Sequence, residues 1–316
     1  MIYCCPKDRG ALSQTESNLV CERCSSKYEI INGIPRFVAM ENYSSSFGFE
    51  WKQFSKTQLD SASMMSQSMD RITGGMGWYA EDVKGKLVLD VGCGSGRFSE
   101  VIAKWGGRVV SLDYSVAIDE AKKNLNNLGL NADFVQGDAL SLPFPDNTFD
   151  AVFSIGVLQH TADPLLALRE MCRVLRPGGL IGLHGIYERT LKKSIHPKYL
   201  FRPITTRIPT ETLFKIVKAW VGFSLPISRF MRKKLKLRQG LVERIMSVAN
   251  YEGAVPGIGD SNVYEWALLD TFDWYSPAYD NPLTKKELED ALAVGKIDKV
   301  IEVDPHGINY KGYKQK

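Results

Sequence analysis

The alternation of apolar and polar positions predicts a regular succession of strands and helices through the middle of the chain. Short apolar runs, which are typical of strands, lie at residues 86–91, 108–112, 134–135, 149–155 and 180–183. Helical spacing is found between these runs at residues 95–105, 115–128 and 163–175. Ser115 is the expected N-cap of the second helix, and the Pro-Gly-Gly sequence at 177–179 is expected to end the third. Strands and helices that alternate in this way indicate βαβ units in a parallel sheet.

The C-terminal part resumes this pattern after an interruption. Thr284 and Glu287 have the spacing of a capping box, and the helix that they open is expected to end near Gly295. Residues 296–303 and 308–314 are expected to form a hairpin that closes the sheet. The predicted fold class is therefore α/β, a Rossmann-like, mostly parallel sheet with helices on both faces.

Breaks in the pattern divide the chain into four expected parts. Residues 1–38 form a small unit that contains cysteines, and residues 39–78 are expected to form a helical N-terminal lid without a core of its own. Residues 188–255 form a basic helical insertion. This insertion separates the two segments of the main domain, residues 79–187 and 256–316.

The composition excludes several classes of protein. Of the 316 residues, 44% are apolar and 24% are charged, which is typical of a globular protein rather than a disordered or coiled-coil chain. No apolar run reaches the roughly 18 to 20 residues of a membrane span. Six cysteines are too few for a disulfide scaffold, and the first ten residues lack the apolar segment of a secretory signal. We therefore expect a cytoplasmic protein.

A glycine-rich segment with two downstream carboxylates predicts a nucleotide-binding site. Residues 90–96, Asp-Val-Gly-Cys-Gly-Ser-Gly, follow a buried strand and open a helix, where backbone N–H groups are unpaired. Asp113 ends the next strand and can accept both hydroxyls of a ribose. Asp138 follows the third strand and can accept the exocyclic amine of an adenine. Without a ligand, the same glycines would form only a tight turn between strand and helix.

These motifs together resemble the class I S-adenosylmethionine-dependent methyltransferases, and most nearly the branch that contains quinone-biosynthesis C-methyltransferases. The resemblance covers residues 86–184 and rests on the motifs DVGCGSG, VVSLDYS, GDALSLPF, FDAVFSIGVLQHT and RVLRPGGLI. It implies a seven-stranded sheet whose last strand is antiparallel, and S-adenosylmethionine as cofactor. A nicotinamide dehydrogenase is the competing interpretation, but the third glycine comes one residue too early for its G-x-G-x-x-G loop.

The resemblance assigns roles to individual residues. The cofactor contacts that it implies are Asp90, Gly92, Cys93, Gly94, Gly96, Asp113, Tyr114, Asp138, Ala139 and Ser154. Methyl transfer requires a base only if the acceptor is a hydroxyl that must lose its proton. His160 and His184 are the two candidate catalytic bases. Alternatively, His160 only hydrogen-bonds its loop, and His184 is a core residue.

The N-terminal cysteines resemble the two knuckles of a zinc ribbon. Cys5, Cys21 and Cys24 supply three thiols, while Asp8 stands where the second cysteine of the first knuckle is expected. Because zinc accepts carboxylate oxygen, Asp8 can complete a tetrahedral site, and Cys4 is the alternative fourth ligand. The segment resembles the small ribbon found before some methyltransferase domains, where it serves docking or stability. The remaining alternative is a ribbon without metal, held by its core and by a hairpin turn at residues 32–33, Asn-Gly.

Two aromatic segments and one basic segment lie outside the predicted sheet. Residues 47–51 and 272–277 either pack as a lid or line an acceptor pocket. Residues 189–244 carry fifteen Lys and Arg against two acidic residues, a net charge of +13 in a chain of net +4. Residues 213–238 have the pattern of a basic amphipathic helix, which indicates contact with a membrane surface or an anionic partner. A solvated structural cap is the alternative.

The sequence therefore predicts an S-adenosylmethionine-dependent methyltransferase. Its expected acceptor is a small molecule or a sugar- or glycan-linked compound, anionic and methylated on oxygen, because the aromatic and basic segments resemble those of methyltransferases in surface-polysaccharide modification. The alternatives are a ribosomal RNA methyltransferase with an N-terminal zinc module and a non-catalytic partner protein with the same fold. No RNA-stacking motif is present, so a nucleic-acid partner is not expected. The basic insertion predicts a peripheral position at the inner membrane face.

Overall fold

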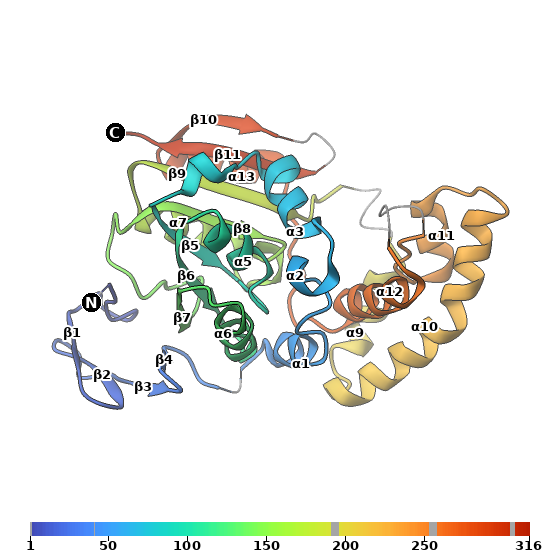
Figure 1. Cartoon of the computed structure of the whole chain (residues 1–316), viewed down its shortest axis with the longest axis horizontal. Coiled ribbons are helices and arrows are strands. Elements are labelled where there is room, and N and C mark those ends of the chain that lie inside the picture. Colours follow the sequence, from blue (N-terminus) through green and yellow to red (C-terminus); the bar gives the residue numbers. More distant parts are fainter. Residues whose placement is uncertain (1, 41, 191–195, 253–257, 304–306) are drawn as a thin grey trace.

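A seven-stranded sheet forms the centre of the protein (Figure 1). The computed structural model describes residues 2–40, 42–190, 196–252, 258–303 and 307–316. The strand order is β10-β11-β9-β8-β5-β6-β7. The strands are β5 (Leu87–Val91), β6 (Arg108–Asp113), β7 (Ala132–Gln136), β8 (Phe149–Ile155), β9 (Leu175–Ile186), β10 (Ile297–Glu302) and β11 (Ile308–Lys314). Strands β5 to β9 are parallel, while β11 is antiparallel to both β9 and β10. The predicted α/β class, seven-stranded sheet and closing hairpin are confirmed.

Helices cover both faces of this sheet. They are α5 (Arg97–Lys104), α6 (Ala117–Asn127), α7 (Pro164–Val174) and α13 (Lys285–Val294), with a short 3₁₀ turn at Leu158–His160. Val88 belongs to one hydrophobic cluster, shared with α5, and the next residue, Leu89, belongs to another, shared with α7 and α13. Because successive strand residues point to opposite faces, this division places apolar packing on both sides of the sheet.

Two local expectations are wrong in detail. Helix α6 begins at Ala117 with Val116 as its N-cap, although the Ser115 hydroxyl does accept a bond from the Ala117 N–H at 3.1 Å. Helix α7 leads directly into β9, so residues 177–179 lie within the strand. They form an irregularity there, because the strand register passes from Leu175 opposite Phe149 to Leu180 opposite Ala151. The capping box of Thr284 and Glu287 is present as expected.

The N-terminal ribbon is a small antiparallel sheet of its own. Its strands are β1 (Leu12–Gln14), β2 (Asn18–Cys21), β3 (Lys27–Ile31) and β4 (Ile34–Pro35). Asn32 and Gly33 both have positive φ, at 54° and 69°, as a two-residue hairpin turn of type I′ requires. Arg36, just after β4, forms an isolated parallel bridge with Gln136 of the edge strand β7, so the ribbon lies against that edge of the main sheet.

Residues 43–84 cross over the sheet as short helices. These are α1 (Ser45–Gln53), α2 (Asp60–Ser63), α3 (Gln67–Asp70), the π-helical turn η1 (Arg71–Gly75) and α4 (Ala80–Val83). Ile72, Met76 and Trp78 are fully buried in the cluster that covers one face of the main sheet. The end of this segment is therefore part of the main core.

The basic insertion forms a helical unit beside the sheet (Figure 1). Its helices are α9 (Pro197–Thr205), α10 (Thr210–Lys233) and α11 (Gln239–Met246). The next helix, α12 (Asp260–Tyr275), shares an apolar core with α10, which includes Val217, Val221 and Phe272. We therefore propose that the unit extends to Tyr275, beyond the expected boundary at 255. Lys192, Lys193 and residues 253–255 of the expected insertion lie outside the described residues.

Within the described residues, no helix is both long and apolar enough to cross a membrane.

Candidate active site

A cavity of about 740 Å³ lies at the carboxyl ends of the parallel strands, between the sheet and the helices α1, α9 and α12. Ligands of open α/β sheets bind at this edge. Seven of the expected cofactor residues line the cavity, namely Gly92, Cys93, Gly94, Asp113, Tyr114, Asp138 and Ala139. They come from the loops that follow β5, β6 and β7. The fold therefore brings together residues that are up to 47 positions apart in the sequence.

The glycine loop and Asp113 form one rigid arrangement. Gly92 and Gly94 have φ values of +81° and +54°, and a Cβ atom at Gly94 would lie 2.9 Å from the Trp51 ring. The Asp113 carboxylate accepts the Gly94 N–H at 2.8 Å through Oδ2 and the Ser115 N–H at 2.8 Å through Oδ1. Burial raises the pKa of Asp113, while the bonds from Ser115 and Gly94 oppose that rise. The carboxylate is thus fixed at the position expected for a ribose contact.

Three expected cofactor residues do not line the cavity and lie behind it. The Asp90 carboxylate is 1% exposed and accepts the Ser99 hydroxyl at 2.7 Å. Its burial raises the pKa of Asp90 to about 7. The Ser154 hydroxyl donates to the Val91 carbonyl at 2.9 Å, and Gly96 caps α5. In this structure these residues support the loop rather than face a ligand.

The two histidines line the same cavity but differ in their surroundings. His160 Nδ1 lies 3.1 Å from the Tyr279 carbonyl, which can only accept, so Nδ1 carries a proton and Nε2 is the ring nitrogen with the lone pair in the neutral tautomer. In contrast, His184 Nε2 accepts a bond from Arg71 Nε at 3.3 Å. The Nε2 lone pair of His184 is therefore already used in accepting the Arg71 bond. The geometry therefore favours His160 over His184 as a proton acceptor.

Two arginines in the cavity were missed by the sequence analysis. Arg71 and Arg97 flank the Phe98 ring, with guanidinium carbons 5.4 and 4.7 Å from its centroid. Neither forms an ion pair with a carboxylate in the described part of the chain. Burial, followed by the charge of Arg71, lowers the pKa of Arg97 to about 9. Two cations without a bonded counter-charge make this part of the cavity suited to an anionic group. The only sequence signal was an arginine near the start of a predicted helix.

Three acidic residues form a second group in the cavity that the sequence did not reveal. Glu50 comes from α1, and Asp270 and Asp273 come from α12. Glu50 is 2% exposed, and its Oε2 has no hydrogen-bond partner among the described residues. Burial, together with Asp273 and Asp270, raises the pKa of Glu50 well above its ordinary value. Burial and Asp273 likewise raise the pKa of Asp270 to about 7, while Arg71 and Arg97 oppose that rise.

The two aromatic segments divide between the lining of the cavity and an apolar core. Phe47 and Trp51 of α1 and Trp274 of α12 line the cavity. Phe49 and Phe272 pack instead in the apolar core between α1, α10 and α12, with ring centroids 6.0 Å apart. One face of each helix therefore closes the cavity, while the other face fixes the helix in place.

Comparison with known proteins identifies the domain that holds this cavity. A family model described as "Methyltransferase domain" matches residues 89–183. The chain contains a methyltransferase domain of the S-adenosylmethionine-dependent type. The demethylmenaquinone methyltransferase of Renibacterium salmoninarum is 38% identical over 124 residues, which are 39% of this chain and 51% of that protein. That of Staphylococcus carnosus is 43% identical over 105 residues, which are 31% of this chain and 42% of that protein.

The chain thus spans about half the length of the curated relatives that it matches. Among solved structures, a S-adenosylmethionine-dependent methyltransferase from Aquifex aeolicus is 17% identical. The match covers 78% of this chain and 94% of that one, with a TM-score of 0.39.

The ribbon that precedes the methyltransferase domain brings four potential metal ligands together. The ligand atoms of Cys5, Asp8, Cys21 and Cys24 all lie within 4.8 Å of one another. The Cys5 and Cys24 sulfur atoms are 3.6 Å apart, and thiolates about 2.3 Å from a tetrahedral zinc lie about 3.8 Å apart. The Gly10 N–H donates to Asp8 at 2.9 Å and lowers the pKa of this carboxyl to about 2, so Asp8 is ionised. Cys4 lies outside this group.

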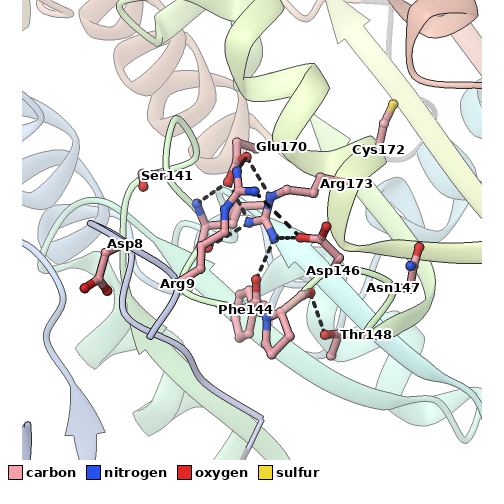
Figure 2. Close-up of polar contacts among 12 residues, drawn as sticks. Asp8, Arg9, Ser141, Phe144, Asp146, Asn147, Thr148, Glu170, Cys172 and Arg173 are labelled. Atoms are coloured by element: carbon pink, nitrogen blue, oxygen red, sulfur yellow. Dashed lines mark hydrogen bonds and ion pairs between the residues drawn. The ribbon is translucent and has the colours of Figure 1, made fainter. Parts of the chain in front are cut away.

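The ribbon docks beside the loop that carries Asp138. The Ser141 hydroxyl donates to the Pro6 carbonyl at 2.6 Å, and the Cys4 N–H donates to the Pro143 carbonyl at 3.0 Å. Figure 2 shows the polar network between the ribbon and α7, where Glu170 accepts bonds from Arg173 of α7 and from Arg9 of the ribbon. The segment after Asp138 is therefore held between the ribbon and α7 of the methyltransferase domain.

The insertion contributes to the cavity, but not through its densest run of positive charge. His196, Lys198 and Tyr199 line the cavity. The basic residues of positions 232–236 do not. Lys198 also pairs with Asp280 at 2.7 Å, so part of its charge is already neutralised. The part of the cavity that the insertion and α12 line therefore carries charges of both signs.

Proposed function

We propose that the protein transfers the methyl group of S-adenosylmethionine to a small organic acceptor bound in the same cavity. The observation that carries this proposal is that one cavity joins the glycine loop and Asp113 to the aromatic and acidic side chains of α1 and α12. Its volume of about 740 Å³ lies within the range of roughly 300–1,000 Å³ typical of small-molecule sites.

The cofactor has a defined orientation in this proposal. Asp138 and Ala139 contact the adenine, Asp113 accepts the ribose hydroxyls, and Gly92 and Gly94 surround the methionine part. Arg71 donates hydrogen bonds to the methionine carboxylate, because it lines the cavity next to Phe98, two residues after the glycine loop, and forms no ion pair within the described residues. The methyl group then faces the half of the cavity that α1 and α12 cover.

The protein's contribution to methyl transfer is alignment of the two reactants and exclusion of water. The methyl carbon of a sulfonium is already activated for attack. Holding the acceptor in line with the carbon–sulfur bond therefore lowers the activation barrier by about several kcal/mol, as in other reactions of oriented reactants. If the acceptor is a hydroxyl, His160 Nε2 takes its proton. The bond between His160 Nδ1 and the Tyr279 carbonyl holds the ring in the required tautomer.

Two classes of acceptor are proposed. The first is a sugar- or glycan-linked compound, anionic and methylated on oxygen, for which Lys198 and the aromatic rings are suitable contacts. The second is a quinone, which is supported by the names of the curated relatives, demethylmenaquinone methyltransferases. A planar quinone ring can stack on Trp274 or Phe47, and the C–H face of a sugar ring can pack against the same side chains. Methylation of ribosomal RNA has no support in these relatives.

We also propose one structural zinc ion, bound by Cys5, Asp8, Cys21 and Cys24. A carboxylate and three thiolates complete a tetrahedral shell and leave no open position for a substrate. The ion would stabilise the ribbon and, through the contacts of Pro6 with Ser141, the loop that carries Asp138.

Methyl transfer from tritiated S-adenosylmethionine tests the proposal. The purified protein is incubated with a cell extract, which is then separated into RNA, lipid-soluble, lipid-linked sugar and water-soluble fractions. Label in the lipid-linked sugar fraction supports the first class of acceptor. Label on a quinone in the lipid-soluble fraction supports the second class. Label in RNA alone, or no transfer despite measurable cofactor binding, would contradict small-molecule methylation.

A further inference from the structure

Helix α10 has two apolar faces, of which the fold uses only one. Leu213, Val217, Val221 and Leu225 are buried in the core shared with α12. Five other large apolar side chains recur at intervals of four, three, four and three residues. They are Ile216, Trp220, Phe223, Ile227 and Phe230, which are 52%, 41%, 63%, 39% and 56% exposed. This spacing places them along a single side of the helix, and that side faces solvent.

The exposed face continues onto the neighbouring helix α11. The Trp220 indole N–H donates to the Met246 carbonyl at 3.2 Å, which joins the end of α11 to this side of α10. Leu241 and Ile245 of α11 are 49% and 57% exposed. We call these two side chains, together with the five of α10, the α10–α11 surface. Isolated exposed apolar side chains are common, but a continuous group of this size marks an interaction site.

Positive charge surrounds the α10–α11 surface. Lys215, Lys234, Lys236 and Arg238 are exposed, and none of them pairs with a carboxylate in the described ranges. Within α10 the only acidic residue is Glu211, at the opposite end from Lys234. The partner that fits this surface is therefore apolar where it meets the rings and negatively charged around them.

We propose that the α10–α11 surface docks on an anionic lipid bilayer, with α10 lying in the plane of the interface. A basic helix with exposed aromatic and aliphatic side chains inserts these between lipid chains, while its cations meet the headgroups. A second copy of the chain is a less suitable partner for this surface. In a symmetric dimer the positively charged rim of one copy would meet the positively charged rim of the other. Binding to the bilayer does not depend on the proposed methyltransferase function. Only its consequence, that the bilayer supplies the methyl acceptor, rests on that function.

The α10–α11 surface lies in the same insertion as part of the cavity lining, so a docked bilayer would be near the cavity. The insertion that carries it also supplies His196, Lys198 and Tyr199 to the cavity. Figure 1 shows α10 and α11 at the far side of α12 from the sheet, on the outside of the molecule. If the protein docks through α10, the acceptor side of the cavity faces the bilayer, and the ribbon faces away from it.

Vesicle sedimentation with the full chain tests this proposal. Vesicles of phosphatidylcholine alone are compared with vesicles that contain phosphatidylglycerol, at low and at high salt. We expect binding to the anionic vesicles, weakened by salt, and a loss of at least tenfold in the double variant Phe223→Glu, Phe230→Glu. The matched control is Val294→Glu, which changes an apolar side chain of α13 that is 71% exposed.

Thermal unfolding and cofactor binding, measured on each variant, show whether it is folded and keep this test separate from that of the proposed function. Equal binding by wild type and the double variant would overturn the proposal. So would a concentration-dependent dimer that the double variant abolishes, because the surface would then join two copies of the chain. A Lys234→Gln, Lys236→Gln variant should bind less at low salt and show a weaker dependence on salt.

Discussion

Replacing Arg71 by methionine should weaken cofactor binding without destabilising the fold. Arg71 has no carboxylate partner in the part of the chain that the structure describes. Desolvation by burial lowers its pKa, so the charged form opposes folding at neutral pH. Methionine retains apolar contact with Phe98 and removes this cost, which offsets the loss of the bond from Arg71 Nε to His184. The melting temperature should therefore stay the same or rise.

The expected loss of affinity follows from the chemistry of the missing contact. A hydrogen bond between charged groups contributes about 1.5–3 kcal/mol, which corresponds to a factor of about 10 to 150 in the dissociation constant. Calorimetry should show this loss for S-adenosylmethionine and S-adenosylhomocysteine. Arg71→Lys keeps the charge and should recover part of the affinity.

A truncated ligand provides the decisive control. Methylthioadenosine has the adenine and ribose of the cofactor but lacks the amino acid part, so Arg71→Met should leave its affinity unchanged. An affinity for S-adenosylmethionine within twofold of wild type would refute the assignment of Arg71 to the carboxylate. An equal loss for both ligands would refute it too, because it would show that the variant disturbs the adenosine site.

Four further predictions concern other parts of the molecule. Asp113→Ala should lower the affinity of both ligands at least about tenfold, since it removes two charge-assisted hydrogen bonds to the ribose; unchanged calorimetry would exclude that role. Elemental analysis should find about one zinc per chain, bound less well after Cys21→Ser, and metal-free wild type would rule the site out. If the acceptor is a hydroxyl, His160→Ala should reduce kcat more than His184→Ala, and the reverse order would contradict the tautomer argument. Burial raises the pKa of Asp90 to about 7, so its contribution to the free energy of unfolding is present below about pH 4 and is lost as pH rises through 7. Denaturant unfolding of Asp90→Asn should therefore show a weaker dependence of this free energy on pH. An unchanged dependence would exclude Asp90 as its source.

Features that depend on neighbouring residues were predictable from the sequence. The glycine loop at 92–96, the hairpin turn at 32–33 and the capping box at Thr284 each need particular residue types within a few positions. The strand periodicity likewise indicated a parallel sheet, because apolar runs alternate with helical spacing. Asp113 and Asp138 were found because parallel strands end at the same edge of the sheet.

The part of the cavity that α1, η1 and α12 line was decided by tertiary structure alone. Glu50, Arg71 and Asp270 lie on three different elements, α1, η1 and α12, and no spacing in the sequence relates them. Their meeting depends on how the helices pack over the sheet, and that packing is set by apolar contacts such as Phe49 with Phe272.

Tertiary packing also decides how the surroundings of the two histidines differ and which face of α10 is buried. In the sequence, His160 and His184 are equivalent candidates, and only the fold places Arg71 beside one and the Tyr279 carbonyl beside the other. The pattern of α10 gave its amphipathic character, but not which apolar face the core would bury. That choice belongs to α12, which covers Val221 and leaves Phe223 in solvent, because a helix can present only one side to a single neighbour.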